Sequence, residues 1–378
     1  MRPEEVSLNI IATRKDLIAH LERAAAVADR KSAVPALANV LLTTDTGRVH
    51  FAATDLYLGA TSTCDATVEK AGEIALPAKD LLDRVKAMPD GPVQITATGT
   101  QATIKAVGAA RRFLLHGLPA QDFPALPRPK DEAFTTIPAS LLAMLMARTH
   151  FSISTDETRA HVNSALFEID GARLRMVSTD GHRLSKAEAI VHDLAGPTRT
   201  MLIPLRAVSE LRRICDAAKD APITIAESGP TVFFTTGGAT FSCKTVESAF
   251  PPWQQVLPAV AAAAARAPRA ALIDALKAAQ VSANARTGGV KVTLAEGVIR
   301  VAGEDPDAGS AFDEVAADYD GREFTIGVNA KYLLDVLGAI DCDEVIIGAK
   351  GELDPFLIRP AVETPTAGFV ACVMPMRI

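Results

Sequence analysis

The sequence predicts an α+β fold of three similar domains, each of which is a doubled unit of one helix followed by strands. Three observations predict it: helix starts of one kind recur at nearly constant intervals, hairpin patterns follow the helices, and Pro-rich segments separate the repeats. A chain of 378 residues fits roughly two to four domains. Because 48% of the residues are hydrophobic but only 5% are aromatic, the cores are expected to be mainly aliphatic.

The clearest repeat is a helix start that occurs in three segments, 76–89, 203–216 and 328–341. Pro77, Pro204 and Asn329 occupy the same position in these segments, 127 and 125 residues apart. Proline suits the first turn of a helix and asparagine suits a cap. Apolar residues follow at helical spacing, so each segment is predicted to be a helix.

A second set of helices and two sets of strands complete the repeat. Helices are expected over 13–28, 137–152 and 268–283. Hairpins are expected over 40–55, 165–180 and 290–305, with turns at Thr46-Gly47, Asp170-Gly171 and Glu296-Gly297. Further strands are expected over 93–108, 223–246 and 345–360. The chain therefore contains about six copies of one small helix-and-strand unit.

The domain boundaries are placed in two Pro- and Ala-containing segments, 126–131 and 256–268, which are expected to be semi-extended or loosely helical connectors. The predicted domains are residues 1–127, 128–257 and 258–378. A domain of this size can bury a core of its own.

Composition excludes several classes of protein. The formal net charge of −6 argues against a surface coated with basic residues, although a local basic stripe remains compatible with it. The five cysteines and seven histidines are widely spaced, so no metal site is expected. No phosphate-binding glycine loop or nucleophile elbow occurs, and we expect no cofactor. Without a signal-like start or a membrane-length apolar run, we expect a cytoplasmic chain that does not enter the membrane.

Basic residues recur near the helix starts. Two positions before the first apolar core residue, the six helices carry Lys15, Lys79, Ala139, Arg206, Ala270 and Lys331. Arg212 and Arg213 extend the basic face of one helix. A single exposed lysine is usually just solvated, but recurrence at one structural position favours a shared surface for a polyanion with a regular backbone.

The stretch VSTDGHRLSK, 177–186, concentrates polar residues and has three interpretations. A hydrolase would use Ser178, Asp180 and His182, but catalytic partners normally converge from separate chain positions. A structural turn would use the Asp-Gly pair to satisfy backbone groups. A recognition site would use the same residues to bind a partner.

Several motifs resemble the bacterial sliding clamp family, the beta subunits of the DNA polymerase III holoenzyme. They are TDGHRL at 179–184, FPPWQQVLP at 250–258, AFDEVAADYDG at 311–321, IGVNAKYLLDVL at 326–337, PFLIRP at 355–360 and CVMPMRI at 372–378. The resemblance spans all three thirds in order. It implies three clamp domains per chain and a homodimer that closes head to tail into a six-domain ring, with helices inside and sheets outside.

The resemblance also implies a hydrophobic pocket that captures short peptides of the replicative polymerase alpha subunit, the clamp loader and repair polymerases. Its matching residues here are Val162, Thr179, Gly181, His182, Arg183, Leu184, Pro251, Gln255, Val256, Cys372, Met374, Pro375, Met376 and Arg377. Flexible methionines suit varied partners. Gln255 stands where many relatives carry Arg, Cys372 replaces a more usual Val, and Ala160-His161 stand where some relatives have aromatic residues near DNA.

Double-stranded DNA is the implied partner of the inner surface, without sequence preference. The expected contacts are Arg30, Lys31, Lys79, Arg206, Arg212, Arg213 and Lys331. The dimer interface is expected near Phe113 and Val281. The implied function is a processivity factor without catalytic activity; a divergent paralogous clamp, with an accessory or inhibitor-tolerance role, is the alternative.

Overall fold

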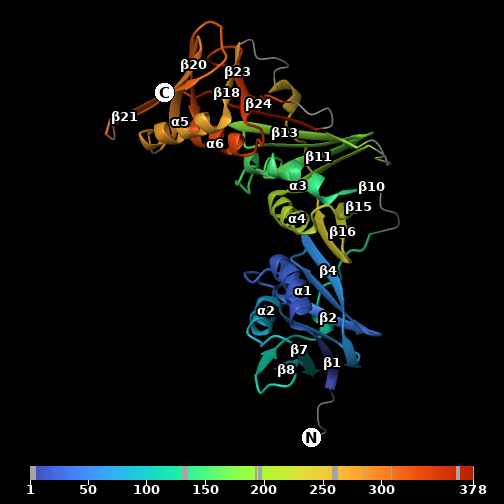
Figure 1. Cartoon of the computed structure of the whole chain (residues 1–378). Coiled ribbons are helices and arrows are strands. Elements are labelled where there is room, and N and C mark those ends of the chain that lie inside the picture. Colours follow the sequence, from blue (N-terminus) through green and yellow to red (C-terminus); the bar gives the residue numbers. More distant parts are fainter. Residues whose placement is uncertain are drawn as a thin grey trace. The chain divides into compact units, whose positions relative to one another are not determined.

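A computed structural model describes residues 6–129, 135–191, 194, 198–257, 263–284, 286–307, 309–362 and 367–377. The chain divides into two compact units (Figure 1). Unit 1 contains residues 1–138 and 220–245, and unit 2 contains residues 139–219 and 246–378. The central third of the chain therefore contributes to both units.

Unit 1 contains two antiparallel sheets and two helices, α1 (Arg14–Val27) and α2 (Ala78–Lys86), which pack against each other. The first sheet has the order β5 (Thr67–Lys70), β1 (Val6–Thr13), β7 (Pro92–Thr98), β8 (Gln101–Ala106), β9 (Arg112–His116). The second has the order β10 (Thr135–Pro138), β15 (Pro222–Ser228), β16 (Thr231–Thr236), β17 (Ala239–Lys244), β4 (Leu58–Asp65), β3 (Arg48–Thr54), β2 (Asn39–Asp45), β6 (Glu73–Pro77). Helix α1 covers β3 and β4, where His20 stacks on Phe51 at 5.3 Å between ring centroids.

Unit 2 repeats this plan with four helices, α3 (Ala139–Ala147), α4 (Leu205–Ala218), α5 (Arg269–Val281) and α6 (Ala330–Gly338). Its eight-stranded sheet has the order β14 (Arg199–Pro204), β11 (Ser164–Asp170), β12 (Arg173–Thr179), β13 (Arg183–Ile190), β25 (Ala367–Val373), β24 (Phe356–Pro360), β23 (Glu344–Ala349), β18 (Ala263–Pro268). Its four-stranded sheet has the order β21 (Gly309–Ala316), β20 (Val298–Asp305), β19 (Gly289–Ala295), β22 (Phe324–Asn329). The β13–β25 pair joins the central and last thirds of the chain in one sheet.

The six predicted helices all form, and their starts have a physical cause. Pro77 and Pro204 are the caps of α2 and α4, one position earlier than the first helical turn in which we expected them. Asn329 caps α6, where its side-chain oxygen accepts the backbone N–H groups of Lys331 and Tyr332 at 3.0 and 3.3 Å. Short 3-10 turns lie at Pro35–Ala38, Ala120–Asp122, His150–Ser152 and Trp253–Gln255.

One predicted connector is wrong in part. Residues 256–268 were expected to be a loose connector, but their second half is β18, which pairs antiparallel with β23. Ala265 and Ala267 are fully buried while Arg266 between them reaches Glu344, so this is a half-buried strand. Residues 258–262 lie outside the described part, as do residues 130 and 131 of the other connector, whose described residues, 126–129, form no helix or strand.

Within the described residues, no helix is long and apolar enough to cross a membrane. The same residues contain no group of three or more His, Cys, Asp or Glu side chains that could hold a metal ion. All five cysteines are free thiols.

Candidate functional site

The stretch that follows β12 is a tight turn held by its own side chains. The Thr179 hydroxyl donates to the carbonyl of Arg183 at 2.7 Å and accepts the N–H of Gly181 at 3.1 Å. One carboxylate oxygen of Asp180 accepts the N–H groups of His182 and Arg183, at 2.9 and 3.0 Å. Gly181 has a φ of +94°, which favours glycine. Asp180 and Thr179 therefore satisfy backbone groups as a structural turn requires, and a turn of this kind can also present His182 to a partner.

The catalytic interpretation fails on geometry. Ser178 is fully buried, and its hydroxyl donates to the carbonyl of Thr149. Asp180 is bonded to the turn backbone and to Arg183, whereas His182 is exposed and stacks on Tyr332 at 6.4 Å. A nucleophile, a base and an orienting acid must be in mutual hydrogen-bond reach, and these three are not.

Arg183 is the centre of a buried polar cluster. Its guanidinium donates to Asp180 at 3.0 Å and to Asp335 of α6 at 2.6 Å. It also lies 4.4 Å from the ring centroid of Tyr332 and 5.6 Å from that of Phe151. The Arg183 side chain is only 10% exposed. Arg183, one of the residues expected in the peptide pocket, therefore binds the turn to helix α6.

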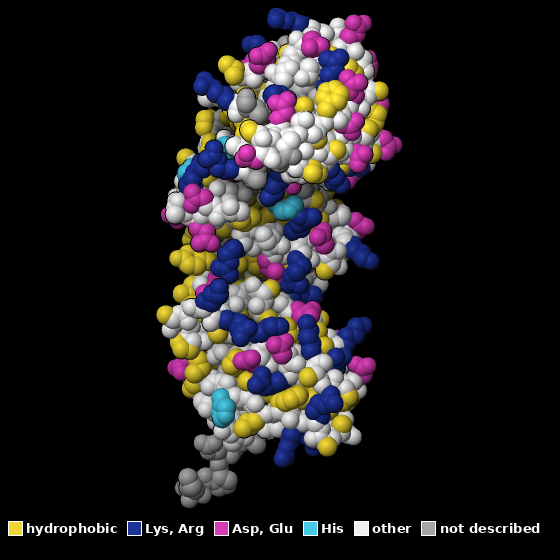
Figure 2. Space-filling model, turned by 90° about the vertical axis from the view of Figure 1, so that its left-hand side faces the viewer, with side chains coloured by type: hydrophobic (Ala, Val, Ile, Leu, Met, Phe, Trp, Pro, Cys, Tyr) yellow, Lys and Arg dark blue, Asp and Glu magenta, His cyan; other side chains and the backbone are white. Residues whose placement is uncertain are grey.

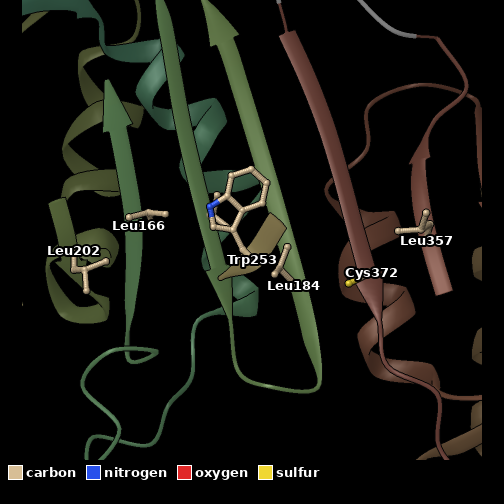
Figure 3. Close-up of a cluster of buried hydrophobic side chains, with 7 residues drawn as sticks. Leu166, Leu184, Leu202, Trp253, Leu357 and Cys372 are labelled. Carbon is tan, nitrogen blue, oxygen red and sulfur yellow. The ribbon is translucent and has the colours of Figure 1, made fainter. Parts of the chain in front are cut away.

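Three of the apolar residues predicted for the pocket, Leu184, Val256 and Cys372, come together at β13 and β25. Leu184 lies directly opposite Cys372, and both belong to a buried cluster that is shown in Figure 3. The cluster contains Leu166, Val177, Leu184, Leu202, Trp253, Leu357 and Cys372. Val256 packs against it, Val162 and Thr179 are buried, and Pro251 is half-buried. Burial raises the pKa of Cys372 to about 12, so this thiol behaves as an apolar core group.

The accessible part of this region comes from the turn, the chain end and the 3-10 turn. Met374 donates its N–H to the carbonyl of His182 at 2.8 Å, and its side chain is 37% exposed. Met376 donates its N–H to Gly327 at 2.8 Å, and Pro375 between them is half-buried. Gly181, His182, Gln255 and Arg377 are exposed. We call the exposed residues Gly181, His182, Gln255 and Met374, together with the half-buried Met376, the turn surface.

Trp253, the only tryptophan, covers the cluster beside an ion-pair network. Its ring centroid lies 5.2 Å from the Arg175 guanidinium and 5.8 Å from the Lys186 ammonium. Arg175 pairs with Glu168 at 2.8 Å and with Glu188 at 3.3 Å, and Lys186 pairs with Glu188 at 3.1 Å. Burial raises the pKa of Glu188, but its hydrogen bonds and charge interactions with Lys186 and Arg175 outweigh burial and leave this pKa lowered.

Sequence reasoning missed four residues of this region, Phe151, Trp253, Tyr332 and Asp335. The last two had a detectable signal, because a spacing of three residues in the helix predicted over 328–341 puts them on one face. Their contacts with His182 and Arg183 have no sequence signal, since the partners are about 150 residues apart in the chain.

The predicted basic residues lie on the helices and one turn, and Figure 2 shows Lys and Arg side chains across the face that carries α1 and α2, with Asp and Glu among them. Lys15, Arg206 and Lys331 are exposed in the first turns of α1, α4 and α6, while Arg30 and Lys31 are exposed just after α1. The partners of three further residues are defined. Lys79 pairs with Asp83 at 2.8 Å, Arg213 pairs with Glu210, and Arg212 lies 2.8 Å from a ring nitrogen of His150.

Phe113 and Val281 lie in different units. Phe113 is half-buried on β9, an edge strand that exposes Leu114 at 53%. Val281 ends α5 and is 83% exposed. Helix α5 packs against β21, another edge strand, whose Phe312 is 64% exposed. Each unit thus has one sheet edge with exposed apolar side chains.

Known proteins are similar to this chain along almost its whole length. Three models of the DNA polymerase III beta subunit match it: the N-terminal domain over residues 8–127, the central domain over 136–252 and the C-terminal domain over 254–377. The beta sliding clamp of Pseudomonas aeruginosa is 30% identical over 369 residues, 97% of this chain and 98% of that protein.

Solved structures agree with the sequence matches. A sliding clamp of Pseudomonas aeruginosa bound to griselimycin has a TM-score of 0.91 at 29% identity, covering 98% of this chain and 100% of that one. The beta sliding clamp of Caulobacter crescentus, with polyethylene glycol bound at its proposed tethering region for beta motifs, has a TM-score of 0.90 at 31% identity and the same coverage.

Proposed function

The chain belongs to the DNA polymerase III beta subunit family, the beta sliding clamps, and from this premise we propose how it works. Two chains close head to tail into a ring around duplex DNA and hold the replicative polymerase at its template in the cytoplasm, without catalysing a reaction themselves. The observation that carries the proposal is the match of all three domain models, in order, along one chain.

The free sheet edges support ring closure. Strand β9 begins at Arg112, next to the exposed Arg111, whereas β21 carries Asp313 and Glu314 beside the exposed Phe312. An edge strand with unpaired backbone groups, apolar side chains and charges of one sign fits a second edge of opposite sign. The proposed interface around Phe113 and Val281 lies at these edges.

Light scattering on a dilution series tests this closure. A mass near twice 39.8 kDa that persists on dilution is expected. A stable monomer at all concentrations contradicts the ring, because one chain has only three of the six domains.

Basic helices support DNA binding without base recognition. Phosphate contacts need only positive charge at suitable spacing, so Lys15, Arg206 and Lys331 at helix starts can follow a duplex of any sequence. Arg30 and Lys31 add charge at the turn after α1. A ring retained by its topology needs only weak contacts of this kind, which permits sliding.

The turn surface, with the apolar cluster beneath it, is the proposed docking site for short peptides of the polymerase alpha subunit, the clamp loader and repair polymerases. Docking raises the effective concentration of a partner at the DNA. Exposed Met374 can adapt to different apolar side chains, and His182 offers a polar ring next to Tyr332.

Griselimycin, which is bound in a structure of the Pseudomonas aeruginosa clamp, serves as the probe, and we propose that it binds this chain at the turn surface. Calorimetric titration is expected to show binding to the wild-type chain and at least tenfold weaker binding to a variant with His182→Ala and Met376→Ala. The solution mass of the variant serves as the control for an intact dimer. Unchanged affinity would remove the assignment of the turn surface.

A further inference from the structure

Unit 1 contains a second copy of the 179–183 turn. Strands β2, β3 and β4 have the same lengths as β11, β12 and β13 and run at a constant offset of 125 residues, from Asn39 to Ser164 and from Leu58 to Arg183. Between β3 and β4 the chain turns at residues 54–58, TDLYL, where the other turn reads TDGHR. Only the first two residues are shared.

The hydrogen bonds of the two turns correspond one by one. The Thr54 hydroxyl donates to the carbonyl of Leu58 at 2.7 Å and accepts the N–H of Leu56 at 2.9 Å. One oxygen of Asp55 accepts the N–H groups of Tyr57 and Leu58 at 2.9 and 2.6 Å. Leu56 has a φ of +76° where Gly181 has +94°. The geometry is kept even though leucine is unfavourable there.

The neighbouring strand is repeated as well. Lys244, at the end of β17, donates its N–H to the carbonyl of Tyr57 at 2.8 Å, as Met374 after β25 donates to His182 at 2.8 Å. Cys243 lies opposite Leu58, as Val373 lies opposite Arg183. The sheet surface around β4 and β17 in unit 1 therefore corresponds to the one around β13 and β25 in unit 2.

The two surfaces differ in what fills them. In unit 2, Trp253 lies over Leu184 and beside Arg175 and Lys186. The unit 1 positions that correspond to Leu184, Arg175 and Lys186 are Gly59, His50 and Thr61, all smaller.

The covering segment differs in the same direction. Unit 2 is covered by FPPWQQV (250–256) and unit 1 by FPALPRP (123–129), which has no aromatic residue after Phe123. Leu126 stands at the Trp253 position and lies against Gly59, but it is smaller than an indole, and the residues beneath it are smaller than their counterparts, so space is left beside it in unit 1.

This space is a groove of about 900 Å³ between the 123–129 segment and the sheet. Four of its lining residues, Thr43, His50, Thr61 and Thr63, occupy the positions of the Glu168, Arg175, Lys186 and Glu188 network in unit 2. Three more lining residues correspond to members of the buried cluster of unit 2: Leu41 to Leu166, Ala52 to Val177 and Ser242 to Cys372. Of these, Ala52 is smaller than its counterpart. The groove exists because unit 1 has neither the ion-pair network nor the indole.

Its chemistry favours an aromatic and acidic occupant. His50 lies 2.9 Å from the hydroxyl of Thr63 and 2.8 Å from the carboxylate of Asp45, so its ring is held between two polar groups. Among the described lining residues, ionisable groups are limited to Arg128 and His50, and none is acidic. A flat ring can lie beside Leu126, over His50 and Thr61, where unit 2 has the longer Arg175 and Lys186, and carboxylates complement Arg128.

We propose that this groove binds an extended segment of a partner protein, which places one aromatic side chain against His50 and Thr61 and acidic residues toward Arg128. It is a second docking site of the chain, separate from the turn surface. The inference rests on the proposed function only in supposing that the clamp recruits partners by extended peptides.

The chain itself supplies the probe. A fluorescein-labelled peptide ESAFPPWQQV, the sequence of residues 247–256, has an acidic residue and the tryptophan in the extended context that covers the corresponding surface of unit 2. Fluorescence polarisation with the full-length chain is expected to show saturable binding. Replacing the peptide tryptophan by alanine is expected to weaken it at least tenfold.

Two variants locate the bound peptide. Thr61→Trp, at an exposed lining position, fills the groove and is expected to weaken binding at least tenfold. The matched control Thr67→Trp, at an exposed position of β5 outside the groove, is expected to leave binding unchanged. Arg128→Glu tests the charge preference and is expected to weaken binding without touching the sheet.

Three results would overturn the second site: no saturable binding to the wild-type chain, equal binding to the Thr61→Trp and Thr67→Trp variants, or loss of binding in the His182→Ala, Met376→Ala variant. Griselimycin separates this inference from the proposed function. Suppose that griselimycin binds the His182→Ala, Met376→Ala variant as tightly as the wild-type chain, while Thr61→Trp still weakens binding of the labelled peptide. The assignment of the turn surface is then wrong, and the groove is still supported as a peptide site.

Discussion

The guanidinium of Arg183 donates to the carboxylate of Asp335 at 2.6 Å, and this contact joins strand β13 to helix α6. Asp180 holds the same guanidinium from the other side at 3.0 Å. Helix α6 also carries Lys331, a proposed DNA contact, one turn before Asp335. A single buried cation therefore connects the turn of the proposed peptide site to a helix of the proposed DNA surface.

Replacing Arg183 with alanine is expected to lower the free energy of unfolding of unit 2 by about 3 kcal/mol, because two carboxylates lose their buried partner. Urea unfolding measures this. Lys291→Ala is the control in the same unit, since its pair with Glu304 is largely exposed and contributes only about 0.5 kcal/mol. Equal losses in the two variants would show that the Arg183 cluster has no special stabilising role.

Trp253→Ala is expected to destabilise unit 2 by about 3 kcal/mol, because it leaves a cavity over the buried cluster. Trp253→Phe should recover most of the loss. As the only tryptophan, Trp253 also gives the chain its indole fluorescence. If griselimycin binds at the proposed turn surface, this emission should shift on titration. Unchanged emission at saturating griselimycin would show that griselimycin binds away from the Trp253 cluster.

Stability is expected to fall on mild acidification. Burial and the neighbouring Arg212 lower the pKa of His150 below its ordinary value of 6.5. The unfolded chain therefore binds more protons at this residue than the folded chain between the two pKa values, so the free energy of unfolding rises with pH in that window. Going from pH 7.5 down through 6.5 should lower the urea midpoint of unit 2. His150→Gln should flatten this dependence, and an unchanged slope would contradict the assignment.

Charge reversal at Arg206, Arg212 and Lys331 is expected to weaken DNA binding and to reduce its salt dependence by about one unit of slope for each phosphate that is no longer neutralised. A salt titration of binding to a DNA duplex measures both. The control is Lys291→Glu, since Lys291 lies on strand β19, where it pairs with Glu304, and is not among the proposed DNA contacts. If the charge-reversal variant binds DNA with the salt dependence of the wild-type chain, these helices do not contact DNA.

Val281→Asp is expected to convert the dimer into monomers, because a carboxylate would be buried at the proposed interface without a partner. Leu353→Asp is the matched control, since Leu353 is 82% exposed and Val281 is 83% exposed in the isolated chain. Light scattering should show halved mass for the first variant and unchanged mass for the second. Halved mass for Leu353→Asp and unchanged mass for Val281→Asp would instead indicate that the interface lies at the loop that carries Leu353.

The helices and hairpins could be predicted because their causes are local. Pro77, Pro204 and Asn329 mark helix starts through caps that depend on one or two residues. The hairpin turns fall at Gly47, Gly171 and Gly297, each of which has a positive φ that glycine adopts without strain.

What the sequence could not reveal depends on distant neighbours or on residues with weak preferences. Strand β18 is built largely from alanines, which signal a strand only through the partner β23. The second turn escaped notice because Leu56 stands at the position of Gly181, so no turn signal remained. The groove follows from comparing Thr61 with Lys186 and Gly59 with Leu184, and that comparison needs the strand register.

The open edges β9 and β21 also set a limit on how the clamp can be handled. Two chains that pair at both edges leave neither β9 nor β21 free, whereas a pair joined at one edge still offers β9 at one side and β21 at the other. Such an opened pair is the seed of a linear polymer, since each added chain restores the same two edges. If the proposed ring is held open for long times at high concentration, we therefore expect chains longer than the dimer, which favours brief opening during the proposed loading onto DNA.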